Sequence, residues 1–379
     1  MVRHGDDVTV PVVRSRGRSS IWAGLAVGLV LLALPTPGAA FQTITIEPNG
    51  LEPGEVLVIH GDQVKTSDEI TVTFDPSTGE LVITHDVLEP LPPECHAVGP
   101  GPPFKEVRCP GLGIVRVYAY SGAGKDKVVA HLENQAGALT MKFLAFLGGD
   151  NDFFEGGEED DEVIDEEDGG SDSVALGGGN NVALLGNGNN LLTAGNGNNV
   201  IKATNGNQKI SFGDGQNQVT VGDGNSKISG GSGGSQVTVG DGNSTVTLAG
   251  GANQATFGDG GGSFFGGTGP DTASFGAGGN QFSGGGGDDY ATTGGGPDVF
   301  HGGPGIDFGR LGSGNDTGFG GPGKDRFLGG PGDDHLFGGP AFDVLNAGPG
   351  SRDKCFGGPG GARPIGCEIG VQYSPTPWR

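Results

Sequence analysis

Short alternations of apolar and polar residues recur in the middle of the chain at a fixed interval. Val219-Thr220-Val221 and Val237-Thr238-Val239 are two examples. Because side chains alternate across a β-strand, the two valines of each triplet face one way and the threonine faces the other. The pattern therefore predicts short β-strands with an apolar inner face and a polar outer face.

These alternations belong to a nine-residue repeat, whose places we number one to nine starting at Gly266. From Gly266 to Asn346 the chain divides into nine consecutive units, such as GGPGKDRFL and GGPGDDHLF. The sixth places are Asp271, Asn280, Asp289, Asp298, Asp307, Asp316, Asp325, Asp334 and Asp343. A disordered glycine-rich tract has no reason to keep such a register, so the repeat indicates an ordered array.

The register continues toward the N-terminus with a different chemistry. Counting back in nines reaches Glu167, and two earlier units, 147–155 and 156–164, are separated from it by Asp165 and Glu166. An isolated unit occupies 121–129. Place six is mostly uncharged in this part: Asn181, Asn190, Asn199, Gln208, Asn217, Ser226, Ser235, Ser244 and Asn253. We expect one array over 147–346, of Asn/Ser type over 147–265 and of acidic type over 266–346.

Composition favours cations as partners and disfavours nucleic acid. The 379 residues include 82 Gly and 24 Pro and carry a formal net charge of −24. Phosphate binding needs clustered Lys and Arg, which an acidic chain does not supply. The most acidic segment, Asp150–Asp168, is expected to be a solvated loop, with a diffuse low-affinity cation trap as the alternative.

The nine units from Gly266 to Asn346 resemble the glycine-rich, aspartate-containing nonapeptide of the RTX (haemolysin-type) calcium-binding family. The resemblance implies an all-β fold, a right-handed parallel β-roll, in which six residues form a turn and three form a strand. Two units would make one coil, and units two apart in sequence would stack. Glycines at places two and four would allow positive φ, and the place-six carboxylates would bridge adjacent turns through Ca²⁺ held by oxygen ligands.

Stacking would place the acidic residues in two files and make them calcium ligands. The expected ligands are Asp271, Asp289, Asp307, Asp325 and Asp343 in one file and Asp298, Asp316 and Asp334 in the other. Asn280 heads the second file as a weaker member, and the isolated candidates are Asp126, Asp152, Asp161 and Asp172. About six sites follow from adjacent Asp pairs. The alternative is that these residues only complete Asx-type turns, as Asn would.

The two halves of the array are expected to depend on metal differently. Place one is usually Gly in the acidic half, and Gly309 and Gly318 leave even place eight empty, so burial there is slight. Each buried aliphatic residue contributes about 1.5–3 kcal/mol, against about 1–2 kcal/mol of backbone entropy per residue. We therefore expect 266–346 to fold as calcium binds. Neutral Asn and Ser ladders would make 147–265 a metal-independent scaffold.

The segments outside the array predict export and end caps. Residues 1–40 combine Arg14, Arg16 and Arg18 with an apolar run and a small-residue exit, as in a secretory signal; an uncleaved anchor is the alternative. The mature chain would have no membrane span. Residues 41–146 predict a β-rich cap, either irregular coils of the solenoid or a separate small sandwich. Its strands are expected at Thr43–Ile46, Val56–His60, Ile70–Phe74, Leu81–His85, Val115–Tyr120 and Leu139–Leu147.

Residues 347–379 predict a C-terminal cap, because the repeat decays after Asn346 and Arg352 stands in the sixth place. The cysteine spacings favour two local disulfides, Cys95–Cys109 and Cys355–Cys367, over metal or redox chemistry. The two disulfides fit an oxidising, extracellular location.

Neither a catalytic motif nor a phosphate-binding loop is present, so we expect no enzyme. The leading interpretation is a secreted or cell-surface calcium-binding β-roll with a structural or adhesive role and an unidentified cell-surface or matrix partner. Ice binding is the alternative, suggested by outward Thr220, Thr238, Thr247 and Thr256 but weakened by neighbouring Lys and Gln. A less favoured enzyme site in 41–146 would require a pocket with convergent carboxylates. Family members usually leave the cell by a C-terminal signal, whereas this chain has an N-terminal one.

Overall fold

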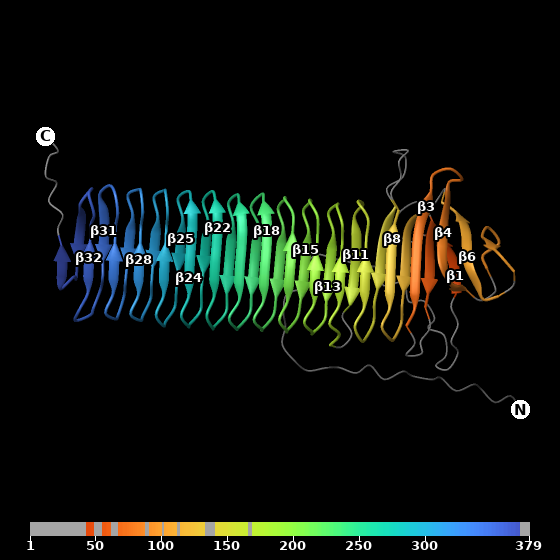
Figure 1. Cartoon of the computed structure of the whole chain (residues 1–379), viewed down its shortest axis with the longest axis horizontal. Coiled ribbons are helices and arrows are strands. Elements are labelled where there is room, and N and C mark those ends of the chain that lie inside the picture. Colours follow the sequence, from red (N-terminus) through yellow and green to blue (C-terminus); the bar gives the residue numbers. More distant parts are fainter. Residues whose placement is uncertain are drawn as a thin grey trace, which may run out of the picture. The chain divides into compact units, whose positions relative to one another are not determined.

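The chain folds into a parallel β-solenoid, seen in a computed structural model. The structure describes residues 43–48, 55–61, 67–87, 91–100, 102–111, 114–132, 141–165 and 169–371. Within these residues every regular element is a strand (Figure 1). The expected all-β fold with two units per coil is therefore confirmed. The signal segment expected at 1–40 lies outside the described residues.

One face of the solenoid is a sheet of 16 strands, called sheet A, which pair in the order given. Its strands are β1 (Thr43–Pro48), β2 (Glu55–His60), β7 (Ile114–Tyr120), β9 (Lys142–Phe146), β11 (Asp161–Asp165), β13 (Val182–Leu185), β15 (Val200–Ala203), β17 (Gln218–Val221), β19 (Gln236–Val239), β21 (Gln254–Phe257), β23 (Thr272–Ser274), β25 (Tyr290–Thr292), β27 (Phe308–Arg310), β29 (Arg326–Leu328), β31 (Asp343–Asn346) and β33 (Ala362–Ile365).

The other face, sheet B, begins with an antiparallel group and continues in parallel. The antiparallel group pairs in the order β5 (His96–Val98), β6 (Phe104–Pro110), β4 (Glu80–Val87) and β3 (Glu69–Asp75). The parallel strands follow from β3: β8 (Lys127–His131), β10 (Phe153–Glu155), β12 (Ser173–Ala175), β14 (Leu191–Thr193), β16 (Lys209–Phe212), β18 (Lys227–Ser232), β20 (Thr245–Gly250), β22 (Ser263–Thr268), β24 (Gln281–Gly286), β26 (Val299–His301), β28 (Thr317–Phe319), β30 (His335–Phe337), β32 (Lys354–Phe356) and β34 (Ile369–Val371).

The pairing register shows the nine-residue unit directly. In both sheets Cα partners are mostly 18 residues apart, as in Val219 with Val237. The offset is 20 where Phe153 pairs with Ser173, because Asp165 and Glu166 add two residues to that coil. It is 19 where His335 pairs with Lys354. Insertions are thus absorbed in single coils without breaking either sheet.

The strands of the N-terminal region belong to these same two sheets. Sheet A runs from β1 and β2 through β7 and β9 into the array, and β8 joins β3 to the first array strand of sheet B. Strands β5 and β6 are absent from the sequence prediction. They lie at 96–98 and 104–110, whereas the prolines from Pro90 to Pro103 predicted a loop carrying Cys95 and Cys109. Cys109 lies within β6 instead. The Cys95–Cys109 and Cys355–Cys367 disulfides are both formed, as predicted.

The core is one continuous cluster of inward side chains from both sheets. In the first half many strands supply two of them, as β17 does with Val219 and Val221 at 1% and 2% exposure, and others, such as β14 with Leu192, supply one. The expectation of a thin core at Gly309 and Gly318 is wrong, because aromatic rings fill the space. Phe300 and Phe327, from opposite sheets, pack edge to face with ring centroids 5.1 Å apart.

Candidate metal centre

The place-six side chains form two buried ladders, one along each row of turns. In most coils of each ladder a place-six backbone N–H donates to the place-six side chain one coil further along; exceptions are Asn217, because Ser235 Oγ has no partner, and Ser244, because Gly262 has no side chain. Asn199 donates to Asn217 Oδ1 at 3.0 Å, and Asp307 donates in the same way to Asp325 Oδ1 at 2.9 Å. Asn and Asp therefore hold neighbouring turns together by the same hydrogen bond, which joins two coils and is not the local bond of an Asx turn.

Asn and Asp differ in the second polar atom of the side chain, which is a nitrogen in Asn and an oxygen in Asp. The Asn199 side-chain N–H₂ group lies 3.3 Å from the carbonyl oxygens of both Gly195 and Gly197, at places two and four, and donates to them. Asn217 repeats this with Gly213 and Gly215. An amide thus satisfies the turn carbonyls from within its own unit, without an added ion.

In an aspartate unit an oxygen takes the position of that nitrogen. Because Oδ1 accepts the same inter-coil hydrogen bond, Oδ2 is left as a second oxygen that cannot donate to a turn carbonyl as the amide nitrogen does. The Oδ2 atoms are buried and have no hydrogen-bond partner among the described residues. They belong to Asp152, Asp172, Asp271, Asp289, Asp298, Asp307, Asp316, Asp325, Asp334, Asp343 and Asp353. A buried carboxylate oxygen without a hydrogen-bond donor requires a proton or a cation beside it.

Glycine at place one makes room beside these oxygens. A Cβ on Gly320 would collide with Asp325 Oδ2 and would approach the Gly338 carbonyl oxygen of the next coil to 2.5 Å. The five Asp residues of the sheet A file, 271 to 343, are each preceded by such a glycine: Gly266, Gly284, Gly302, Gly320 and Gly338. The space is lined by carboxylate and carbonyl oxygens, which are the ligands of Ca²⁺.

Electrostatics oppose ionisation of these groups when no cation is bound. Burial raises the pKa of Asp289, Asp307 and Asp316 to about 7 and that of Asp334 to about 6, from an ordinary value of 3.8. Neighbouring carboxylates raise each pKa further, and the inter-coil hydrogen bond lowers it. A bound divalent ion would offset the cost of ionising these groups.

The secondary candidates differ among themselves. Asp126, Asp152 and Asp172 lie in the sheet B file, linked by hydrogen bonds of 2.8 and 2.9 Å. Asp161 differs, because its Oδ2 accepts the Gly157 N–H at 3.1 Å. Asn280 is arranged like the scaffold asparagines, since its side-chain N–H₂ donates to Gly278 O at 2.9 Å.

Over residues 150–165 the acidic segment Asp150–Asp168 is not the solvated loop that was predicted, and its last residues, 166–168, lie outside the described residues. It forms β10 and β11, because its place-six residues Asp152 and Asp161 turn inward. The two-residue insertion adds Asp165, which is 3% exposed and contacts Asp172. Burial, followed by that contact, raises the pKa of Asp165 to about 8.

Three place-six positions escape the sequence pattern. Asp68 begins the sheet B file by donating its N–H to Asp126 Oδ1 at 2.8 Å, although its unit lacks glycine at place four. One extra residue shifts the register after Asp334, so that Asp353 and not Arg352 takes the sixth place. Glu368 is the next residue of the same file. The shifted spacing of Asp353 from Asp334 was the only signal that could have revealed it.

No three His, Cys, Asp or Glu side chains among the described residues converge on one point. A cation in these turns would therefore use paired carboxylates plus backbone carbonyls. The fold and these turns define a parallel β-roll with carboxylate-lined gaps between coils.

Comparison with known families identifies the repeat. Four copies of the RTX calcium-binding nonapeptide repeat match residues 184–219, 276–308 and 311–351, so these segments belong to that family and the predicted resemblance is confirmed. The chain therefore carries a calcium-binding β-roll module. No curated protein and no solved structure matches the chain. The described residues include no helix able to cross a bilayer.

Proposed function

We propose that Ca²⁺ binds between the turns of 266–346 and that this half folds as the ion binds. The proposal rests on the difference between the side-chain atoms of Asn and Asp at place six. Asn donates to the turn carbonyls through its amide nitrogen, whereas the matching atom of Asp is a buried oxygen without a partner. Eight aspartates are the proposed ligands: Asp271, Asp289, Asp298, Asp307, Asp316, Asp325, Asp334 and Asp343. Asp152 and Asp172 are secondary candidates.

The Asn/Ser half is proposed to act as a metal-independent template. Its ladder hydrogen bonds form without an ion at Asn181 and Asn199, and its strands bury one or two apolar residues each. Titration of calcium-depleted protein with CaCl₂, measured by calorimetry and by circular dichroism, tests two proposals. One is that 266–346 folds as calcium binds, and the other is that the Asn/Ser half folds without it. Heat of binding with a partial gain of β signal is expected. The absence of both would refute calcium-dependent folding.

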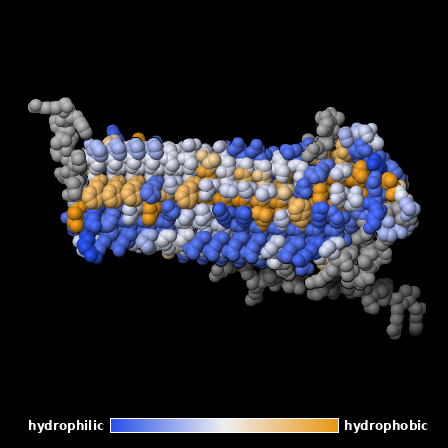
Figure 2. All heavy atoms as spheres, in the orientation of Figure 1, coloured by the Kyte–Doolittle hydropathy of each residue, from blue (hydrophilic) through white to orange (hydrophobic). Residues whose placement is uncertain are grey.

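We further propose an extracellular structural or adhesive role. The two disulfides suit an oxidising compartment. The C-terminal coils also carry outward aromatic side chains at place nine of sheet B. The rings stack with centroids 4.7 to 4.9 Å apart at His301, Phe319, Phe337 and Phe356. Figure 2 shows apolar side chains gathered in a row on the C-terminal coils. Detection of the native protein in culture medium or on the cell surface, with loss on deleting 1–40, tests export.

Ice binding is a second candidate, because the sheets sort the outward hydroxyl groups into files. Thr220, Thr238 and Thr256 align on successive strands of sheet A and continue through Ser274 and Thr292. Thr247 lies on sheet B instead. Thermal hysteresis that is lost on Thr238→Lys would favour this candidate, and its absence in the wild-type protein would remove it.

We propose that the protein is not an enzyme. A cavity of about 420 Å³ does lie over β3 and β4, lined by Asp68, Glu69 and His85 among others. However, Glu69 forms an ion pair with Lys127 Nζ at 2.6 Å, and His85 Nδ1 lies 3.2 Å from the Glu69 carbonyl oxygen. These contacts support a structural use of the lining residues. Hydrolysis of an ester, phosphoester, peptide or glycoside substrate that is lost on His85→Ala would contradict the proposal.

A further inference from the structure

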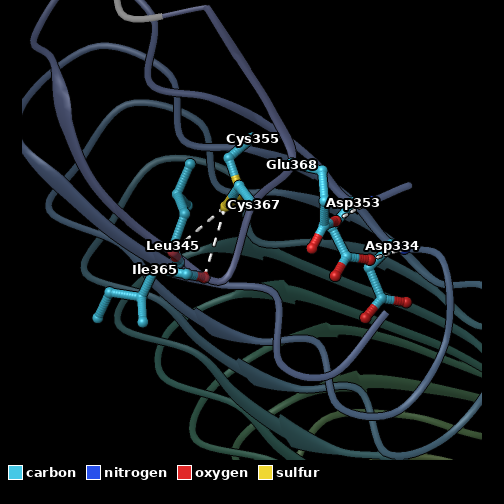
Figure 3. The surroundings of a disulfide bond; sticks show 7 residues. All are labelled: Asp334, Leu345, Asp353, Cys355, Ile365, Cys367 and Glu368. Carbon is cyan, nitrogen blue, oxygen red and sulfur yellow. Dashed lines mark hydrogen bonds between the residues drawn. A yellow bond between two sulfur atoms is a disulfide. The ribbon is translucent and has the colours of Figure 1, made fainter. Parts of the chain in front are cut away.

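The carboxylate file of sheet B continues beyond the nonapeptides into the C-terminal cap (Figure 3). Asp334, Asp353 and Glu368 lie one after another, at the starts of consecutive strands. Asp334 N–H donates to Asp353 Oδ1 at 2.7 Å, and Asp353 N–H donates to Glu368 Oε2 at 2.7 Å. Both contacts repeat the link between place-six residues in the array.

Asp353 has the features of a calcium-type place six. Its side chain is 0% exposed, and its Oδ2 has no hydrogen-bond partner. A Cβ on Gly350 would collide with the Gly332 carbonyl oxygen and lie 2.5 Å from both Asp353 carboxylate oxygens. Three oxygen atoms thus surround this position, and the Gly332 oxygen among them belongs to the preceding coil, that of Asp334.

The nearby Arg352 does not take the place of a cation at the Asp353 carboxylate. Arg352, the adjacent residue, directs its guanidinium to Asp333, with Nη2 3.0 Å from Oδ2. Glu368 is exposed, so the last gap opens to solvent while Asp353 remains buried. A cation could therefore enter from the Glu368 side.

A covalent bond holds Glu368 in register. Glu368 belongs to no nonapeptide, but its neighbour Cys367 is bonded to Cys355, two residues after Asp353 in β32. The disulfide fastens the segment carrying Glu368 to the coil that carries Asp353. In the array, by contrast, the repeat itself provides this register.

We propose that Asp353 and Glu368 form a terminal site for a hard divalent cation such as Ca²⁺, and that the Cys355–Cys367 disulfide positions Glu368 for it. The inference rests on the calcium-binding function proposed above. It adds a site whose last ligand comes from the cap, outside the segments matched to the repeat family.

The test is calorimetric titration of the full chain with CaCl₂, comparing wild type, Glu368→Gln and Asp259→Asn. Both substitutions remove one charge and keep an acceptor oxygen, for Asp353 N–H in one case and for Ala277 N–H, at 2.8 Å, in the other. Glu368→Gln should lose one bound ion, or weaken one by about ten-fold. Asp259→Asn should retain the wild-type stoichiometry.

A Cys355→Ser/Cys367→Ser variant should show the same loss as Glu368→Gln. Equal binding by Glu368→Gln and wild type would overturn the terminal site and leave the sites of 271–343 standing. Normal binding by the cysteine variant would overturn the role of the disulfide. Wild-type protein that binds no Ca²⁺ would instead refute the proposed function.

A crystal structure of the calcium-loaded wild type decides the matter if the variants do not fold. An ion between Asp353 and Glu368 is expected. Ions between Asp307 and Asp325 with none at Glu368 would overturn the proposal.

Discussion

Asp307 donates its backbone N–H to Asp325 Oδ1 at 2.9 Å, although the two residues lie 18 positions apart in the chain. The hydrogen bond uses one carboxylate oxygen and leaves the other, Oδ2, buried without a partner. The same residue thus links two turns and leaves an acceptor for an ion between them.

Replacing Asp307 by Asn should separate these two roles. The amide oxygen keeps the hydrogen bond from Asp289 N–H, while the new N–H₂ group satisfies the turn carbonyls as in the scaffold. We expect about ten-fold weaker calcium binding and higher stability in chelator. Calorimetry and thermal melts measure both, with Asp259→Asn as the control. Unchanged calcium binding would show that Asp307 is only a turn residue.

Chelation should unfold one half of the array and not the other. The acidic half holds unpaired buried carboxylates, whereas most place-six side chains of the Asn/Ser half are neutral and hydrogen-bonded. Hydrogen exchange followed by mass spectrometry should show loss of protection over 266–346 and retained protection over 182–257. Uniform loss along the array would contradict the template role of the first half.

Acid should stabilise the calcium-free protein. The pKa of Asp289, Asp307 and Asp316 is raised to about 7 in the fold, so the folded state binds protons more tightly than the unfolded chain. The resulting stability is present below about pH 4 and is lost as pH rises toward about 7. The far-ultraviolet β signal in metal-free buffer should therefore increase as pH falls.

With calcium present the pH dependence should reverse, because protons compete for the same carboxylates. Calcium affinity should fall as pH drops below about 7, as measured by titration at several pH values. A calcium-free signal that is independent of pH would show that these carboxylates are not buried in solution.

Gly320→Ala should weaken calcium binding, although Gly320 does not adopt the positive φ that favours glycine. The added Cβ would collide with Asp325 Oδ2 and approach the Gly338 carbonyl oxygen, filling the space proposed for the ion. Gly286→Ala is the matched control, because nothing lies within 4 Å of its added Cβ. About ten-fold weaker binding is expected for Gly320→Ala alone. Equal binding by the two variants would argue against this space as the site.

Gly309→Ala should overpack the core by its contact with Phe327. An added Cβ would lie 2.8 Å from the Phe327 ring, and the expected cost is about 1–3 kcal/mol. Phe327→Leu should relieve part of that cost in a double-mutant cycle, measured in saturating calcium. Strictly additive effects would mean that the ring does not occupy this space.

The sequence predicts whatever depends on the repeat itself. Val219 and Val221 face inward because strand alternation requires it, and Asp325 follows Asp307 because the coil length is fixed. The role of Phe327 was not predictable, since it fills space across the two sheets. Asp353 and Asp68 were missed because one follows an inserted residue and the other lacks the glycine signature.

The ladder also gives the roll a direction. Most place-six amides in the ladder are capped by the coil that follows them, so removing the last coils would strand buried N–H donors at the new end. Removing the first coils would instead free side-chain acceptors, which water can hydrate readily. The two ends of the molecule are therefore not equivalent, and a chain shortened from the C-terminus should fray more than one shortened equally from the N-terminus.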